Sequence, residues 1–222
     1  MRVVLWTDAA NVALRQTSVW RLRGLRARSY LIRQRVTFER QATNPNDTFA
    51  VQCPRILVVS GASGVGKTTL VRIVEARGIP GVWFHYFDAI GVPTPDQMST
   101  EFGDPANWQL AMTNRWIERL ATANGLSVLD GQIRPSTVRA ACRQFHVDGH
   151  ILLIDCSHAV REARLRDSRR QPELNTRDMA CWASYLRGQA DALDLPVLDT
   201  TDLSIEAGAD WLQAHISALA AL

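Results

Sequence analysis

The chain has 222 residues, of which 46% are hydrophobic and 21% charged, and its formal net charge is +3. This length is sufficient for one domain with a buried core, and the composition excludes collagen-like, low-complexity and wholly disordered chains. It contains no uninterrupted apolar run of about 18 residues, so we expect no membrane-spanning helix and no membrane partner.

Residues 1–50 differ in charge from the remainder of the chain. They hold nine arginines and only three acidic residues, whereas residues 51–222 hold 16 basic and 19 acidic residues. The excess positive charge therefore belongs to the N-terminal arm, and we expect no nucleic-acid partner for the rest. An Arg-rich, acid-poor arm is also typical of an organelle transit peptide. We instead expect a poorly ordered extension, or a start codon assigned too early, followed by one folded domain at 51–222.

The four cysteines are Cys53, Cys142, Cys156 and Cys181. No two of them have the spacing of a zinc or redox motif, and no histidine lies at ligand spacing from them. We expect small buried hydrophobes in a reducing compartment, and hence a cytoplasmic protein.

From residue 55 onward, short apolar runs alternate with helical patterns. Predicted strands occupy residues 56–59, 82–87, 127–129, 151–154 and 196–198. Helix N-caps are predicted at Thr94, Asp104, Ser136, Ser157, Thr176 and Ser204. One helix carries Trp108, Met112, Trp116 and Leu120 on a single apolar face. Alternating strands and helices predict a three-layer α/β fold, with a parallel sheet covered on both faces.

A glycine-rich phosphate-binding motif follows the first predicted strand. It reads Gly61-Ala62-Ser63-Gly64-Val65-Gly66-Lys67-Thr68, with Thr69 next, and it matches G-x-x-x-x-G-K-[ST] at every fixed position. The glycines allow backbone N–H groups to face phosphate oxygens, and the following helix presents its positive dipole end to the same group. We expect Lys67 to reach the β- and γ-phosphates of ATP and the Thr68 hydroxyl to bind Mg²⁺.

The lysine of this motif is the only lysine among 25 basic residues, the other 24 being arginine. An ammonium is a compact point charge, whereas guanidinium is a broad planar fork. The sequence therefore indicates chemistry at position 67 that excludes arginine. A coding bias with one surviving lysine is the alternative, and so is a chance match to the motif; the strand before it and the helix after it disfavour both.

Other motifs narrow the class of phosphate-binding protein. The guanine-binding Asn-Lys-x-Asp segment of GTPases would need a second lysine, and the Leu-Ser-Gly-Gly-Gln signature of transporter ATPases is absent from the sequence. The chain stops too early for the helical lid domain of an AAA motor. We expect a small-molecule kinase that uses ATP and Mg²⁺, with a regulatory or switch NTPase acting through a protein partner as the alternative.

Three further stretches, residues 87–93, 129–136, and 171–174 with 182–187, resemble P-loop kinase-like proteins often labelled AAA-family ATPases. The core is similar to the nucleoside/nucleotide kinase group, which includes shikimate, gluconate and adenylate kinases. The resemblance covers roughly residues 55–205 and implies a five-stranded sheet of order 2-3-1-4-5. It also implies a small-molecule acceptor, for which a sugar, nucleoside, nucleotide or antibiotic hydroxyl would fit.

The resemblance also implies roles for residues that follow the strands. Asp88 would hold the acceptor hydroxyl or the magnesium shell, with a plain turn-forming aspartate as the alternative. Asp130 would hold a magnesium-bound water, or else only form a strand-end turn. Gln132 and Arg134 would grip the acceptor, or serve structure alone.

A mobile lid is implied around residues 161–175, where five arginines crowd the chain. Arg161 and Arg164 would close on the transferred phosphate, because like charges three residues apart repel unless an anion lies among them. A solvated basic face paired with acidic neighbours is the alternative. Thr200 would contact adenine.

Overall fold

The computed structural model describes residues 54–222, and residues 1–53 lie outside that range. The expectations for the arm at 1–50 and for Cys53 therefore stay predictions. Within the described part of the chain, no helix is long and apolar enough to cross a membrane.

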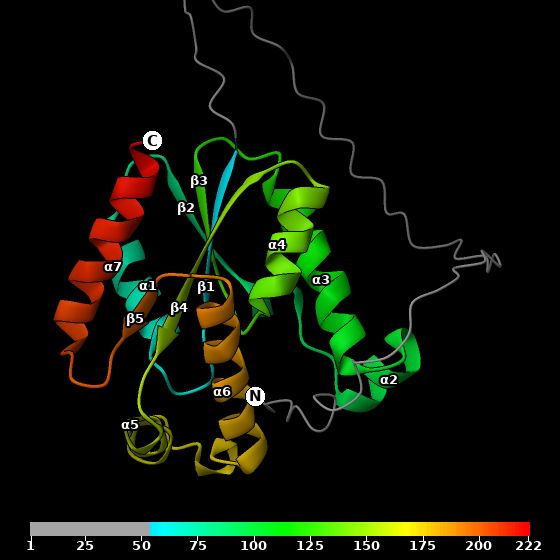
Figure 1. Cartoon of the computed structure of the whole chain (residues 1–222), viewed down its shortest axis with the longest axis vertical. Coiled ribbons are helices and arrows are strands. Elements are labelled where there is room, and N and C mark those ends of the chain that lie inside the picture. The colour runs from blue at the N-terminus through cyan, green and yellow to red at the C-terminus, as the bar shows by residue number, and fades with distance from the viewer. Residues whose placement is uncertain (1–53) are drawn as a thin grey trace, which may run out of the picture. The chain divides into compact units, whose positions relative to one another are not determined.

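Five parallel strands form the sheet (Figure 1). They are β1 (Arg55–Ser60), β2 (Val82–Tyr86), β3 (Leu126–Asp130), β4 (Asp148–Asp155) and β5 (Val197–Asp199). Their order is β2-β3-β1-β4-β5, which confirms the predicted order. The central β1 is buried over five of its six residues, because neighbouring strands flank it and helices cover both its faces.

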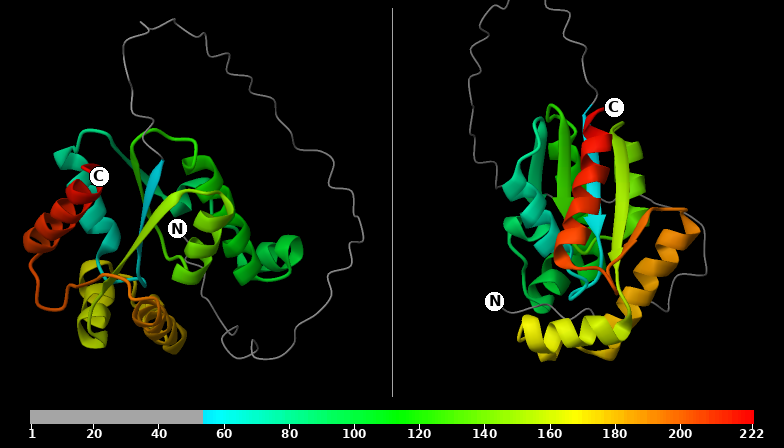
Figure 2. Two further views of the ribbon diagram at one scale, coloured as in Figure 1. Left: turned by 45° about the horizontal axis from the view of Figure 1, so that its top comes forward. Right: turned by 90° about the vertical axis from the view of Figure 1, so that its left-hand side faces the viewer.

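Helices cover both faces of the sheet. On one face, α1 (Lys67–Arg77) packs against α7 (Ile205–Ala220), which lies in front of the strands and runs roughly along them in the right-hand view of Figure 2. On the other face, α3 (Pro105–Leu120) packs against α4 (Pro135–Gln144), and α2 (Pro95–Phe102) against α3. The long α6 (Arg177–Ala192) contacts both β4 and α4. Two apolar clusters fill the layers, and the predicted α/β architecture is confirmed.

Five of the six predicted N-caps are confirmed by side chains that accept a backbone N–H three residues ahead: Thr94, Asp104, Ser157, Thr176 and Ser204. The sixth was placed wrongly. Helix α4 begins at Pro135 with Arg134 as its N-cap, because proline at the first helical position sets the helical φ. Ser136 lies inside the first turn, where its hydroxyl accepts a hydrogen bond from Gln189 on α6.

Two further expectations need correction. Strand β2 ends at Tyr86, one residue early, because Phe87 opens the 3₁₀ turn η1 (Phe87–Ile90) and packs edge-on against Trp108 with ring centroids 5.9 Å apart. Cys142 and Cys156 are buried as expected, but Cys181 is exposed. The reason is that Cys181 precedes the buried Trp182 on α6 and so projects away from the core side of that helix.

The segment after β4 is irregular. A short helix, α5 (His158–Ala163), continues into the π-helical turn η2 (Arg164–Ser168) and then the 3₁₀ turn η3 (Pro172–Leu174). Leu165 and Leu174 are buried and anchor this segment to the domain. It occupies the place of the lid predicted around residues 161–175.

Candidate functional site

A cavity of about 750 Å³ opens at the carboxyl ends of the central strands, the edge at which open α/β sheets bind ligands. One end is formed by the glycine-rich phosphate-binding motif at residues 61–68, called the P-loop below, and by the start of α1. A second group of residues follows β2 and β3, and a third comes from η2, the loop after β5 and α7. Residues far apart in the sequence therefore share one space.

The P-loop leaves the central strand through Gly61. A Cβ atom added there would lie 2.4 Å from the carbonyl oxygen of Ile154 on β4, so only glycine fits. Residues 64–69 line the cavity and include Lys67, Thr68 and Thr69, whereas Ala62 and Ser63 are buried beneath it. The loop ends at Gly66, the N-cap of α1. The N-terminus of α1 is thereby presented to the cavity.

Lys67 is 8% exposed, and it lines the cavity. Across residues 54–222, no carboxylate lies within 4.0 Å of its ammonium. A buried cation without a counter-ion favours an anionic ligand, because leaving it unpaired is costly.

Thr68 and Asp130 meet at the centre of the cavity. The Thr68 hydroxyl donates a hydrogen bond of 2.5 Å to Oδ2 of Asp130. Asp130 is 5% exposed, and its other oxygen, Oδ1, has no hydrogen-bond partner within residues 54–222. An orphaned buried carboxylate oxygen beside a hydroxyl fits Mg²⁺, which takes oxygen ligands and keeps several waters. No cluster of three metal-ligating side chains occurs in the described part, so such an ion would depend on phosphates and water as well.

Asp88 lies in η1 and lines the same cavity as the P-loop. Burial in the cavity wall raises the pKa of its carboxyl group, Lys67 lowers that pKa, and Asp130 raises it. The side chain keeps solvent access, which screens these charges.

The aromatic residues of α3 hold η1 in place. Trp116 donates its indole N–H to the carbonyl of Phe87 at 3.2 Å, and Trp108 contacts the ring of Phe87. Both tryptophans are buried and are not among the residues that line the cavity. By fixing Phe87, the two tryptophans position the adjacent Asp88.

The residues after β3 form a hydrogen-bonded chain that sequence reasoning only partly anticipated. Gln132 lines the cavity and donates to Ser63 Oγ at 2.9 Å, which ties it to the P-loop. Gln109 of α3 donates to the carbonyl of Gln132 at 2.6 Å and accepts from Arg134 at 2.5 Å. Arg134 also stands over the ring of Trp182, 4.9 Å from its centroid. Arg134 does not line the cavity itself.

Gln109 was missed by sequence reasoning. It is 1% exposed, on the helix predicted to present an apolar face. A glutamine next to Trp108 on that helix was the signal that could have found it, because buried amides need hydrogen-bond partners.

The two arginines predicted to act in the lid, Arg161 and Arg164, line different cavities. Arg164 lines the cavity, where it donates to Thr200 Oγ1 at 2.9 Å, to the Thr200 carbonyl at 2.7 Å and to the Val65 carbonyl at 3.1 Å. Thr200 also lines the cavity, beside the large exposed apolar side chains of Leu203 and Ile205. Arg161 is not among these residues and lies in a second cavity.

The chain is similar in fold to several solved structures. A shikimate kinase from Acinetobacter baumannii, solved with shikimate, superposes with a TM-score of 0.51 at 17% identity, covering 76% of this chain and 96% of that one. A gluconokinase from Sinorhizobium meliloti gives 0.50 at 18%, covering 76% and 95%. A tunicamycin resistance protein from Deinococcus radiodurans gives 0.50 at 18%, covering 73% and 95%. No family model and no curated protein matches the sequence. The predicted kinase-like architecture is confirmed: the described chain has the P-loop fold that these solved kinases share.

Proposed function

We propose that the protein is an ATP-dependent phosphotransferase that moves the γ-phosphate to a hydroxyl group of a small molecule. The observation that carries this proposal is the single cavity in which the P-loop and the carboxylate of Asp88 face the same space. Phosphoryl transfer requires mainly positioning and charge neutralisation, and this cavity supplies a cation, helix N–H groups and a carboxylate.

Each residue then has a role in one step. Lys67 and the N–H groups of the P-loop hold the β- and γ-phosphates. The acceptor oxygen bonds to the γ-phosphorus as the bond from that phosphorus to the β–γ bridging oxygen breaks, and Asp88 takes the acceptor proton. Bound Mg²⁺, held through Thr68 and Asp130, would neutralise charge on the phosphates.

The base of ATP would lie between Arg164, Thr200 and the apolar side chains of Leu203 and Ile205. This placement leaves the region beside Asp88 and Gln132 for the acceptor, because both residues line the cavity on the side of β2 and β3. Two of the solved neighbours carry the names shikimate kinase and gluconokinase, and these names support a small-molecule acceptor. A soluble, cytoplasmic enzyme is consistent with this proposal.

The alternative function is a switch NTPase whose output is a change in a protein partner. The continuation of the cavity past the phosphate site to Asp88 and Gln132 favours an acceptor over a switch, because a switch needs no second substrate pocket.

ADP release separates the two functions. Purified protein with ATP and Mg²⁺ is screened against nucleosides, nucleotides, sugars and hydroxylated metabolites, with the Lys67→Met variant as control. We expect at least one compound to accelerate ADP release in the wild type alone, with phosphate incorporated into that compound. Slow release that no compound accelerates, but that a protein partner changes, would favour the switch.

A further inference from the structure

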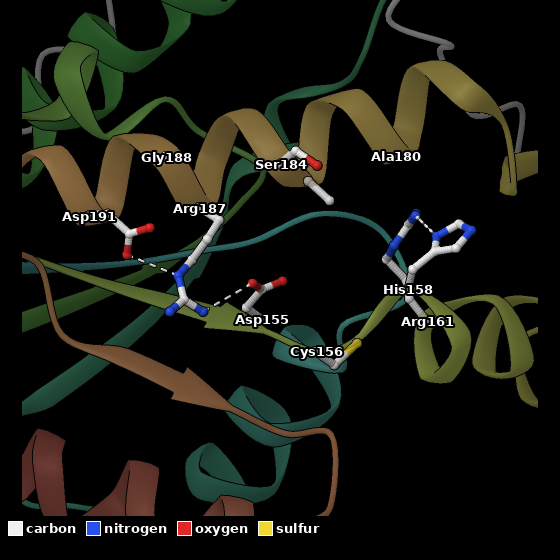
Figure 3. A pocket seen from close by; sticks show the side chains of 10 residues that line it. Asp155, Cys156, His158, Arg161, Ala180, Ser184, Arg187, Gly188 and Asp191 are labelled. Atoms are coloured by element: carbon white, nitrogen blue, oxygen red, sulfur yellow. Dashed lines mark hydrogen bonds and ion pairs between the residues drawn. The ribbon is translucent and has the colours of Figure 1, made fainter.

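A second cavity, of about 470 Å³, lies between α6 and the end of β4 with α5 (Figure 3). Asp155 ends the strand and Cys156 follows it, His158 and Arg161 come from α5, and residues from Ala180 to Asp191 line the cavity along α6. It shares no lining residue with the nucleotide cavity.

Arg161 is the unusual member of this second cavity. It is 1% exposed, and one nitrogen of its guanidinium, Nη2, lies 2.9 Å from Nδ1 of His158. The other, Nη1, is buried and has no hydrogen-bond partner among the described residues. No carboxylate of residues 54–222 lies within 4.0 Å of this guanidinium. A buried guanidinium without a counter-ion is costly, and a donor without an acceptor adds to that cost.

The other charged side chains of the cavity are paired with one another. Arg187 pairs with Asp191 at 3.0 Å and with Asp155 at 3.6 Å, and Figure 3 shows these pairs apart from Arg161. With Arg161 these groups are two guanidinium cations and two carboxylates, so the formal charges of the arginines and aspartates that line the cavity sum to zero. The guanidinium of Arg161 is the one that has no carboxylate of residues 54–222 within 4.0 Å.

We propose that the second cavity binds a small molecule bearing a carboxylate or phosphate group, whose oxygen accepts a hydrogen bond from Nη1 of Arg161. A guanidinium fork suits both groups, because each offers two oxygens in a plane that matches its N–H donors. The volume of the cavity exceeds that of a single inorganic ion, so the ligand carries an organic part beside Ala183 and Gly188 of α6.

The second cavity adjoins the P-loop through Arg161. At Gly64, where φ is +88°, an added Cβ would lie 3.0 Å from Cγ of Arg161 and 3.2 Å from its carbonyl oxygen. The P-loop backbone thus rests directly on Arg161. A ligand that fixes this side chain changes the free energy of the P-loop conformation, so occupancy of the second cavity and nucleotide affinity are coupled, and the coupling is reciprocal.

Thermal unfolding of the full chain tests the site without depending on catalysis. The protein is saturated with ADP in the absence of Mg²⁺, so that the P-loop is filled, and malonate, citrate or inorganic phosphate is added at constant ionic strength with chloride as reference. We expect at least one of these anions to raise the melting temperature above the chloride reference.

Two variants and a matched control locate that effect. Arg161→Met removes the charge and keeps an unbranched stem. Gly188→Leu fills the cavity, since a Cβ at Gly188 meets no atom within 4 Å, and Gly188→Ala is its control. We expect the anion-dependent shift to vanish in Arg161→Met and Gly188→Leu and to persist in Gly188→Ala. Without ligand, Arg161→Met should melt no lower than the wild type, because it relieves an unpaired charge.

Three results would overturn the site: no anion-specific shift in the wild type, an undiminished shift in Arg161→Met, or a large fall in the melting temperature of ligand-free Arg161→Met. Coupling is measured as ADP affinity with and without the stabilising anion. We expect a change of about fivefold or more in the wild type and none in Arg161→Met. An equal response in both proteins would show competition at the P-loop and overturn the coupling.

Discussion

The ammonium of Lys67 lies in the nucleotide cavity, and no carboxylate of the described residues reaches ion-pair distance from it. At the residue scale, this makes Lys67 a cation available to phosphate oxygens. The fold does not need its charge for an internal pair, so charge removal should affect ligand binding more than stability.

The variant Lys67→Met tests this directly. It keeps the length and apolar stem of the side chain and deletes the charge, so we expect ATP-dependent turnover to fall by about 10²-fold or more, with the fold intact. Turnover and circular dichroism are the measurements. Arg77→Met, at the exposed end of the same helix, is the control and should turn over normally. Undiminished turnover in Lys67→Met would remove the proposed nucleotide site.

Asp88 is the residue on which the acceptor end of the mechanism depends. If it accepts the proton of the acceptor, Asp88→Asn should preserve ATP affinity and lower transfer by about 10²–10⁴-fold. If it belongs to the magnesium shell, the variant should need more Mg²⁺ for half-maximal rate. ATP affinity, magnesium dependence and transfer rate on this variant separate the two roles. Normal transfer at normal magnesium would withdraw Asp88 from the site.

The pH dependence of transfer follows from the same group. Burial raises the pKa of the Asp88 carboxyl group, and a general base must be ionised to act. We therefore expect the rate to fall as the pH decreases through this raised pKa, at a higher pH than for an ordinary aspartate. A pH–rate profile measures this, and Asp88→Asn should lack the acidic limb. The free energy of unfolding should change with pH in the opposite direction to the rate. Because the pKa of Asp88 is raised in the folded state, ionisation of this carboxyl group destabilises the fold as the pH rises. Asp88→Asn, which cannot ionise, should therefore not be less stable than the wild type at neutral pH.

At the scale of elements, Arg164 and the Thr200 hydroxyl together attach η2 to the P-loop and to the loop after β5. Thr200 is 4% exposed; its Oγ1 accepts from Arg164 and lies 3.1 Å from the carbonyl oxygens of both Val65 and Asp155. Three segments that are distant in the sequence thus meet at a single buried side chain. Its loss should loosen both the lid segment and the phosphate cradle.

Thr200→Val tests this connection, since it keeps the shape and deletes the hydroxyl. We expect a loss of about 1–3 kcal/mol in the free energy of unfolding, because buried polar groups lose a partner. Denaturant titration measures it, and ADP affinity should fall as well. Thr200→Ser retains the hydroxyl and should lose less than Thr200→Val. Equal stability of the valine variant and the wild type would show that these hydrogen bonds contribute nothing to the fold.

At the scale of the whole molecule, the sheet, its helices and both cavities are built from residues 54–222. The described clusters supply apolar packing on both faces of the sheet. We therefore propose that residues 51–222 form the folded kinase-like unit and that residues 1–50 have no folded role.

Deletion of residues 1–50 tests that division. We expect the melting temperature and ATP affinity of the truncated protein to remain nearly those of the full chain. Differential scanning calorimetry and nucleotide titration are the measurements. A drop of many degrees on truncation would show that the arm packs against the domain.

Much of the fold could be predicted from the sequence because its signals are local. The apolar run before Gly61 predicts a buried strand, and Thr94, Asp104 and Ser204 mark helix starts through hydrogen bonds that span three residues. The P-loop is equally local, since one strand, one turn and one helix contain it. Two local predictions were wrong. Ser136 is not the N-cap of α4, because Pro135 occupies the first helical position. Cys181 is exposed, because the orientation of α6 decides which of its side chains face the core.

The sequence by itself determined the P-loop, the helix starts and the alternation that makes an α/β sheet. Only the tertiary structure decided which distant residues share a cavity. Thr68 and Asp130 meet across 62 residues, and Arg161 and Arg164, three apart in the sequence, line different cavities. The physical reason is that backbone hydrogen bonding and caps depend on near neighbours, whereas the environment of a side chain depends on how strands and helices pack.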